Sequence, residues 1–155
     1  MEYFQKKVRE IMSRPARTVA PEMTLGDLLR LFSSNDFDAY PVVRAEKLVG
    51  IVSRADSIRP FVAKDATSTR ESDAILGTTI EQIMSSHVLT VELDATLEQT
   101  IGLMDANDFE SFPVVDQENR VRGMIARDDL VRALARSTGH TPLPLDVRPL
   151  GYAIA

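Results

Sequence analysis

Two short stretches of the chain place hydroxyl and carboxylate groups where a helix can begin. Ser53 and Asp56 stand three residues apart before an apolar run, and Asp129 stands at the same place before another. At a helix N-terminus several backbone N–H groups lack intrahelical partners and the dipole is positive, which favours an anion such as a phosphate. A carboxylate one turn into the helix can accept hydrogen bonds from vicinal hydroxyls of a sugar. The pattern therefore indicates a small-molecule site.

The same residues have a purely structural interpretation. A Ser-x-x-Asp sequence before an apolar run also caps a helix, and such a cap is worth about 1 kcal/mol without any ligand. The second copy has Ala126 in place of Ser53. Capping therefore explains Asp129 less well than it explains Asp56, although the helix dipole also stabilises an acidic first turn.

Composition excludes several other kinds of site. The 155 residues are 44% hydrophobic, enough for one core or for two small halves. A net charge of −5 without a long lysine- or arginine-rich run argues against nucleic acid as a partner. The chain has no cysteine, so it has no disulfide or thiolate metal site. No secretory signal and no stretch of 18 apolar residues is present, so we expect a cytoplasmic protein without a membrane partner.

No arrangement of residues typical of catalysis is present. The only histidines, His87 and His140, lack metal-ligand spacing and are expected at the surface. GxGxxG, P-loop and GxSxG motifs are absent. We therefore predict no enzymatic activity and no metal site. A hydrolase or metal-dependent enzyme that uses the acidic residues is the minor alternative.

The chain repeats itself after 72 residues. NDFDAYPVV from Asn35 returns as NDFESFPVV from Asn107, and IMS, TV and TL recur at the same offset. GIVSRAD from Gly50 returns as GMIARDD from Gly123, at an offset of 73. The two copies span about 8–62 and 80–135, and a repeat of this length determines the architecture.

Each copy carries the signals of the same elements. Apolar residues at helical spacing follow Thr24 and Thr96, which can cap the helices, and Asn35 and Asn107 suit a left-handed residue that ends them. Two β-branched runs and a further helix follow in each copy. The expected strands are 40–43, 48–52, 112–115 and 121–125, and the expected later helices are 54–62 and 127–135.

These elements predict an α+β fold. With the extended RTV and LTV pieces counted as strands, each copy reads β-α-β-β-α. A half of about fifty residues buries too little surface alone, so the copies should pack about a pseudo-two-fold axis. We expect a first repeat with an N-terminal helix over 1–62, a linker over 63–79, a second repeat over 80–138 and a tail over 139–155. The polar stretch 64–73 reads as a surface loop or linker, and the three prolines of the tail exclude a continuous helix.

The doubled series of motifs resembles the CBS-domain family, and specifically the tandem CBS pair called a Bateman module. The resemblance rests on IMS, TV, TL, the YPVV or FPVV run, and GIVSRAD or GMIARDD, in one order in both copies. It covers nearly the whole chain apart from the linker and the tail. It implies a pseudo-symmetric unit, usually a homodimer, whose two clefts often bind adenine nucleotides or related adenosyl compounds and which regulates an enzyme, channel or transporter.

By this resemblance the family's Gly-h-h-(Ser/Thr)-x-x-Asp pattern, in which h is hydrophobic, falls on Ser53 and Asp56. The second copy keeps Asp129 but lacks the hydroxyl at Ala126, so we expect unequal clefts, with weaker phosphate binding at the second. Each cleft should take this group from one copy and its threonine from the other. The expected ligand-binding residues are Thr18, Asp38, Ala39, Tyr40, Pro41, Ser53, Arg54, Asp56, Thr90, Glu110, Ser111, Phe112, Pro113, Ala126, Arg127 and Asp129.

Acidic residues beside the clefts limit the ligand. Asp36, Asp38, Asp108 and Glu110 disfavour a bare triphosphate. This leaves AMP, ADP, a magnesium-bridged nucleotide such as ATP, or S-adenosylmethionine. We expect a stand-alone regulatory module that signals to an unknown target protein, and the alternative is a ligand-free dimerisation or scaffold module.

Overall fold

The helices and strands follow the repeat in the sequence. The computed structural model describes residues 2–63 and 68–140. The first repeat contributes α3 (Leu25–Ser34), β1 (Ala39–Arg44), β2 (Lys47–Ser53) and α4 (Arg54–Ala63). The second contributes β3 (Val91–Glu92), α7 (Leu97–Asn107), β4 (Ser111–Val115), β5 (Val121–Ala126) and α8 (Arg127–Ser137). Four short helices complete the fold: α1 (Glu2–Gln5), α2 (Val8–Ile11), α5 (Thr69–Leu76) and α6 (Ile80–Ile83).

Two small sheets form the centre of the two repeats. β1 and β2 pair antiparallel, whereas β3 lies parallel to β4 and β4 pairs antiparallel with β5. The expected α+β architecture is confirmed. The RTV piece of the first copy makes only an isolated parallel bridge, between Val19 and Val42, so it is not the strand that we predicted. Its counterpart in the second copy is the two-residue strand β3.

The predicted helix starts are confirmed and Asn35 ends α3 as predicted, but the left-handed conformation expected at Asn35 and Asn107 is wrong. Thr24 Oγ1 accepts a hydrogen bond from the N–H of Asp27, at 3.3 Å, and Thr96 caps α7 in the same way. Asn35 is extended, with φ −135°, because its side-chain amide caps the helix by donating to a carbonyl of the last turn. Asn107 is still helical, and the left-handed residue is Asp108, with φ 54°.

The interpretation of 64–73 as a loop is wrong from residue 68 onward. Ser68 and Glu71 form reciprocal side-chain to backbone hydrogen bonds of 3.2 Å that begin α5. Ile75 on this helix is 2% exposed and packs in the first core. Residues 64–67, and the tail from 141 onward, lie outside the described residues.

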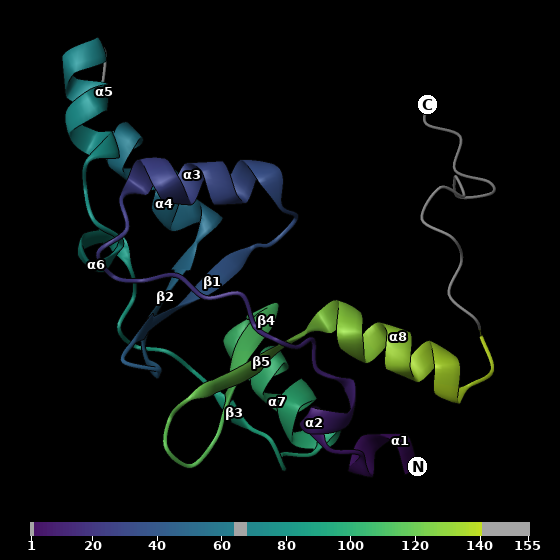
Figure 1. Ribbon diagram of the computed structural model, residues 1–155. Coiled ribbons are helices and arrows are strands. Elements are labelled where there is room, and N and C mark those ends of the chain that lie inside the picture. Colours follow the sequence, from purple (N-terminus) through teal and green to yellow (C-terminus); the bar gives the residue numbers. More distant parts are fainter. Residues whose placement is uncertain (1, 64–67, 141–155) are drawn as a thin grey trace, which may run out of the picture.

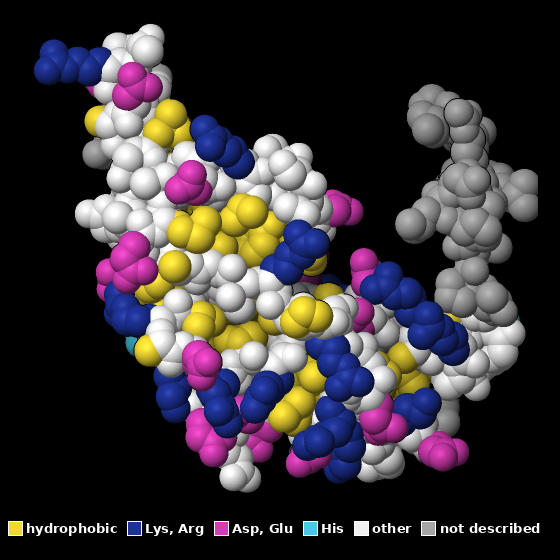
Figure 2. Space-filling model, in the orientation of Figure 1, with side chains coloured by type: hydrophobic (Ala, Val, Ile, Leu, Met, Phe, Trp, Pro, Cys, Tyr) yellow, Lys and Arg dark blue, Asp and Glu magenta, His cyan; other side chains and the backbone are white. Residues whose placement is uncertain are grey.

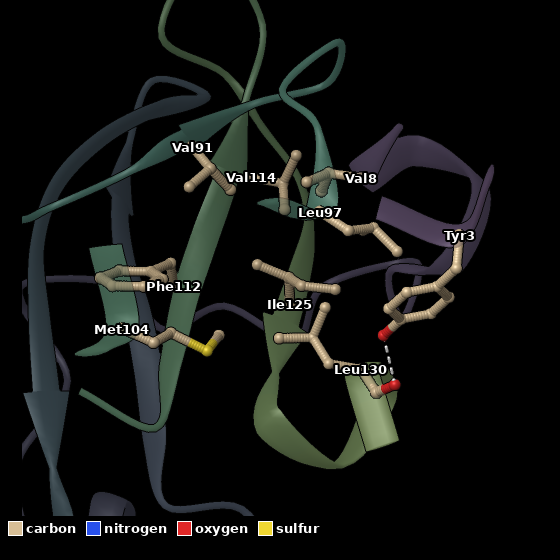
Figure 3. Close-up of a cluster of buried hydrophobic side chains, with 9 residues drawn as sticks. All are labelled: Tyr3, Val8, Val91, Leu97, Met104, Phe112, Val114, Ile125 and Leu130. Carbon is tan, nitrogen blue, oxygen red and sulfur yellow. Dashed lines mark hydrogen bonds between the residues drawn. The ribbon is translucent and has the colours of Figure 1, made fainter. Parts of the chain in front are cut away.

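The short helices cross between the repeats. In Figure 1, α1 and α2 lie beside the elements of the second repeat, and α5 and α6 lie beside those of the first. Figure 3 shows Tyr3 and Val8 within the core of the second repeat, where the hydroxyl of Tyr3 donates to the carbonyl of Leu130 at 2.6 Å. Ile80 on α6 is fully buried in the first core. Each core is therefore completed by residues at the start of the other repeat or just before it.

Equivalent contacts confirm the pseudo-two-fold arrangement. Lys7 bridges Thr96, and Thr24 bridges Thr79, which is the same pair with the two copies exchanged. The expected axis therefore relates the two repeats.

The turns of the two hairpins meet on this axis. Lys47 bridges its own equivalent, Arg120. The N–H of Leu48 donates to the carbonyl of Asn119, and the side-chain amide of Asn119 donates back to the carbonyl of Leu48, both at 3.0 Å. The two sheets are thereby joined through backbone groups.

Candidate functional site

A cavity of about 410 Å³ lies between the two repeats. One wall is the segment 13–17, which follows α2 in the first repeat, and another is the stretch 36–39 that leads into β1. The second repeat supplies the remaining lining residues, which are Ser111, Met124, Ala126, Asp128, Asp129 and Arg132. The cavity therefore combines segments from both copies, as expected for a cleft between them.

The segment 13–17 is held against β5 by backbone hydrogen bonds. The N–H of Ser13 donates to the carbonyl of Met124 at 2.9 Å, and the N–H of Met124 donates back at 3.0 Å. This close approach is possible because Gly123 has no side chain: a Cβ there would lie 2.7 Å from the carbonyl oxygen of Ser13. The repeated glycine of GMIARDD thus shapes the cavity wall.

Asp129 lies at the start of α8 and is 8% exposed. Its Oδ2 accepts from the N–H of Ala126 at 2.8 Å, and its Oδ1 accepts from Ser13 Oγ at 3.2 Å and from Arg132 Nη2 at 3.1 Å. A carboxylate has about four acceptor positions. One position therefore stays free, and a hydroxyl of a ligand can also replace that of Ser13.

Asp56, the equivalent carboxylate, belongs to a complete helix cap and has no side-chain partner from the other repeat among the contacts of the described residues. It accepts from the N–H of Ser53 at 2.8 Å, and the hydroxyl of Ser53 accepts from the N–H of Asp56 at 3.2 Å. Arg59 pairs with the same carboxylate at 3.0 Å. The capping interpretation is thus realised in full at Ser53 and Asp56, but only in half at Asp129, where Ala126 has no hydroxyl.

The two arginines that we expected at the ligand are engaged within the protein. Arg54 donates to the carbonyls of Phe37 and Asn35, at 2.7 and 2.9 Å, and so fixes the loop 36–39. Arg127 lies 3.7 Å from Asp108. Both are about half exposed, and neither lines the cavity at Asp129.

The residues before each PVV run divide into two groups. Ala39 and Ser111 are partly exposed and line the cavity, together with Asp38. The rings of Tyr40 and Phe112 are 2% and 1% exposed and belong to the two cores. The following residues Pro41 and Pro113 are buried in strands β1 and β4.

The remaining expected residues lie outside this cavity. Thr18 is exposed and directly follows the segment 13–17. Thr90 lines a shallower hollow on the second repeat, beside Gly102. Glu110 is exposed, and its carbonyl accepts from the N–H of Arg127 at 2.9 Å.

Nine lining residues were missed at the sequence level: Ser13, Arg14, Pro15, Ala16, Arg17, Phe37, Met124, Asp128 and Arg132. A signal was available, because Arg14 and Arg17 directly follow the repeated IMS, where the second copy has Ser86 and Leu89. With these residues the lining holds three arginines and four aspartates, so it carries one net negative charge. Basic side chains thus offset much of the acidity that the sequence suggested.

Other kinds of site find little support within residues 2–63 and 68–140. No group of three or more histidine or carboxylate side chains in this part of the chain could hold a metal ion. None of its helices is long and apolar enough to span a membrane. On the face shown in Figure 2, lysine and arginine side chains are interspersed with aspartate and glutamate.

Two pseudo-symmetric α+β repeats with an inter-repeat cavity at the start of the last helix define a class of tandem-repeat modules. The CBS-domain family model matches residues 8–56 and 80–136. The chain belongs to the CBS-domain family and is a tandem CBS pair. Pairs of this family are typically regulatory modules.

Two curated relatives illustrate where such pairs occur. Uncharacterized protein MJ0188 of Methanocaldococcus jannaschii is 29% identical over 153 residues, which cover 94% of this chain and 52% of that protein. Inosine-5'-monophosphate dehydrogenase of the same organism is 30% identical over 128 residues, covering 82% of this chain and 23% of the enzyme. The chain thus spans about half of the first relative and about a quarter of the second.

Solved structures share the fold. Protein MJ1225 from M. jannaschii is 28% identical, with a TM-score of 0.78 over 84% of this chain and 48% of that one. The CBS pair of protein MJ0100, in complex with 5-methylthioadenosine and S-adenosyl-L-methionine, gives a TM-score of 0.70. CBSX2 of Arabidopsis thaliana, in complex with AMP, gives 0.73. Each of these two is 24% identical and covers 85% of this chain and 98% of its own, which shows a common fold.

Proposed function

We propose that the chain binds an adenosyl compound in the cavity at Asp129 and signals its presence to a partner protein. The carboxylate of Asp129 holds the ribose hydroxyls. The observation that carries this proposal is the hydrogen bond between Asp129 and Ser13, because it places a sugar-binding carboxylate where the two repeats meet.

The ligands of similar structures support the proposal. The pair from MJ0100 binds 5-methylthioadenosine and S-adenosylmethionine, and CBSX2 binds AMP. These ligands share an adenosine moiety and differ in charge. A cavity with charges of both signs and a volume of about 410 Å³ has room for such a moiety. The binding experiment below compares the candidate ligands, and adding magnesium to the nucleotides tests whether the ion binds with them.

The position of the cavity supports the proposed signalling. A ligand there contacts the segment 13–17, the loop 36–39 and the start of α8, which belong to different repeats. Binding stabilises the relative position of the repeats that suits the ligand, and a partner that distinguishes this position responds. The partner is a target protein in the cytoplasm.

Isothermal titration calorimetry tests the site with AMP, ADP, ATP, 5-methylthioadenosine and S-adenosylmethionine. We expect Asp129→Asn to weaken binding at least tenfold, because it removes the charge that attracts the ribose hydroxyls. Asp56→Asn is the matched control and should have a smaller effect. The sequence alone favoured Asp56, because of Ser53, but the cavity lies at Asp129. Equal and unaltered binding by both variants would refute the assignment.

We further propose a homodimer formed through helices α4 and α8. Ile58 and Val62 on α4 are 56% and 74% exposed, and Val131, the equivalent of Ile58, is 64% exposed on α8. Two apolar faces related by a pseudo-two-fold axis suit a second copy with the same pair of faces. We expect a dimer in multi-angle light scattering and a monomer for Ile58→Glu combined with Val131→Glu. A dimer that binds none of the five ligands would instead favour the scaffold function.

A further inference from the structure

One aromatic side chain that lines the cavity is partly exposed. Phe37 is 40% exposed and belongs to the lining, on the wall formed by the loop 36–39. Asp129 lies on another wall, which the second repeat supplies. A flat apolar surface and a sugar-binding carboxylate therefore face one space from different repeats.

The ring and the backbone of Phe37 contact other residues of the first repeat. It packs edge-on against Tyr40, with ring centroids 5.6 Å apart, and Tyr40 is anchored in the first core against Phe32, at 5.0 Å. The backbone carbonyl of Phe37 accepts a hydrogen bond from Arg54 Nε. The ring is thus positioned before any ligand arrives, which lowers the entropic cost of binding.

A guanidinium group lies against the same ring. The central carbon of the Arg17 guanidinium is 5.6 Å from the ring centroid, and Nη1 of Arg17 donates to Asn35 Oδ1 at 3.0 Å. Arg17 also lines the cavity. A cation beside the ring and a second planar group favour stacking of a flat, nitrogen-rich heterocycle.

We propose that Phe37, together with Arg17, is the platform on which the purine base of the ligand stacks, and that this pair selects ligands with a planar base. The inference rests on the proposed function of the cavity. The base then contacts the first repeat while the sugar contacts Asp129 in the second, so the ligand bridges the two repeats.

The second copy offers a matched control. Phe109, the equivalent of Phe37, is 47% exposed and packs edge-on against Phe112, with centroids 5.8 Å apart. The position equivalent to Arg17 is occupied by Leu89. Phe109 therefore presents a similar ring without the guanidinium.

Tryptophan fluorescence tests the stacking, because the chain has no tryptophan of its own. We expect AMP and S-adenosylmethionine to quench the emission of Phe37→Trp as they saturate the site, and ribose 5-phosphate, which has no base, to leave it unchanged. Phe109→Trp should respond weakly at the same concentrations. An equal response of Phe109→Trp, or quenching by ribose 5-phosphate, would overturn the assignment to Phe37.

Affinity provides the second readout. We expect Phe37→Leu to raise the dissociation constant for AMP about threefold to tenfold, and Phe109→Leu to leave it within twofold of wild type. Both rings are partly exposed, so both variants should keep the circular dichroism of the parent. Unchanged affinity of Phe37→Leu overturns this inference while the proposed function stands. No binding of any adenosyl compound by the wild-type chain overturns both.

Discussion

At the scale of single residues, the absence of a side chain at Gly123 determines the shape of the cavity. A Cβ at this position would meet the carbonyl oxygen of Ser13 at 2.7 Å and Met12 Sδ at 2.8 Å. We therefore expect Gly123→Ala to lower the free energy of unfolding by about 1–3 kcal/mol, since the segment that contains Ser13 must move. The same movement should weaken binding of AMP, measured by calorimetry.

Gly102 serves as the control for this substitution. It lies within α7, and a Cβ there would meet no atom within 4 Å. Gly102→Ala should raise the free energy of unfolding by about 0.5–1 kcal/mol, because alanine loses less backbone entropy in a helix. Denaturant unfolding measures both variants. Equal stability of Gly123→Ala and the parent would argue against the close approach at this position.

The site could be predicted from the sequence only in part. The repeated helix starts pointed to Asp56 and Asp129, and the order of the repeat placed Asp38, Ala39 and Ser111 nearby, all of which except Asp56 line the cavity. The sequence marked Arg17 only as a departure from the repeat, and its place in the lining depends on how the segment 13–17 packs against β5. Whether an arginine or aspartate lines the cavity or pairs within the protein depends on its neighbours in the tertiary structure.

At the scale of elements, Asp116 organises the turn between β4 and β5. Partial burial would raise its pKa, but hydrogen bonds from the backbone of Arg120 and from the guanidinium groups of Arg120 and Arg122 lower the pKa from 3.8 to about 2. These guanidinium contacts are 3.0 Å long. Because the pKa is lower in the folded state, the stabilisation is complete above about pH 4 and is lost as the pH falls towards 2.

Asp116→Asn removes the charge and the oxygen that accepts from the two guanidinium groups, while its remaining side-chain oxygen can still accept from the turn backbone. We expect this variant to be less stable than the parent at pH 7 and the difference to shrink between pH 4 and pH 2, as measured by urea unfolding. Asp94→Asn, which removes an exposed ion pair with Arg9, is the control and should change little. A constant difference across the pH range would contradict the role of the carboxylate charge.

Most helices and strands followed from local patterns, and the exceptions have local reasons. The strong periodicity after Thr24 and the paired β-branched runs predicted α3, β1 and β2. Helix α5 was missed because its composition is polar, although Ser68 and Glu71 form a capping box that the sequence displays. Ile75 is its one buried residue, and a single buried position gives no periodic signal.

At the scale of the whole molecule, the exchange of short helices between the repeats could not be derived from the sequence. The first residues of the two copies, VREIMS and IEQIMS, are alike, so each satisfies the local requirements of either core. Tyr3 and Val8 complete the second core, and Ile75 and Ile80 complete the first. The exchange is a choice between two packings with the same pattern, and local propensity does not distinguish them.

Because the short helices pack on the opposite repeat, a substitution in one of them should destabilise the core of the other repeat. Val8 and Ile80 are equivalent in the repeat and both are 0% exposed. We expect Val8→Ala to cost about 2 kcal/mol and Ile80→Ala about 3 kcal/mol. Hydrogen exchange should accelerate first in β4 and β5 for Val8→Ala, although this residue begins the first repeat, and in β1 and β2 for Ile80→Ala. Thermal unfolding should stay a single transition in both, because each half lends a helix to the other core. Faster hydrogen exchange confined to β1 and β2 for Val8→Ala, and to β4 and β5 for Ile80→Ala, would show that each short helix packs on its own repeat.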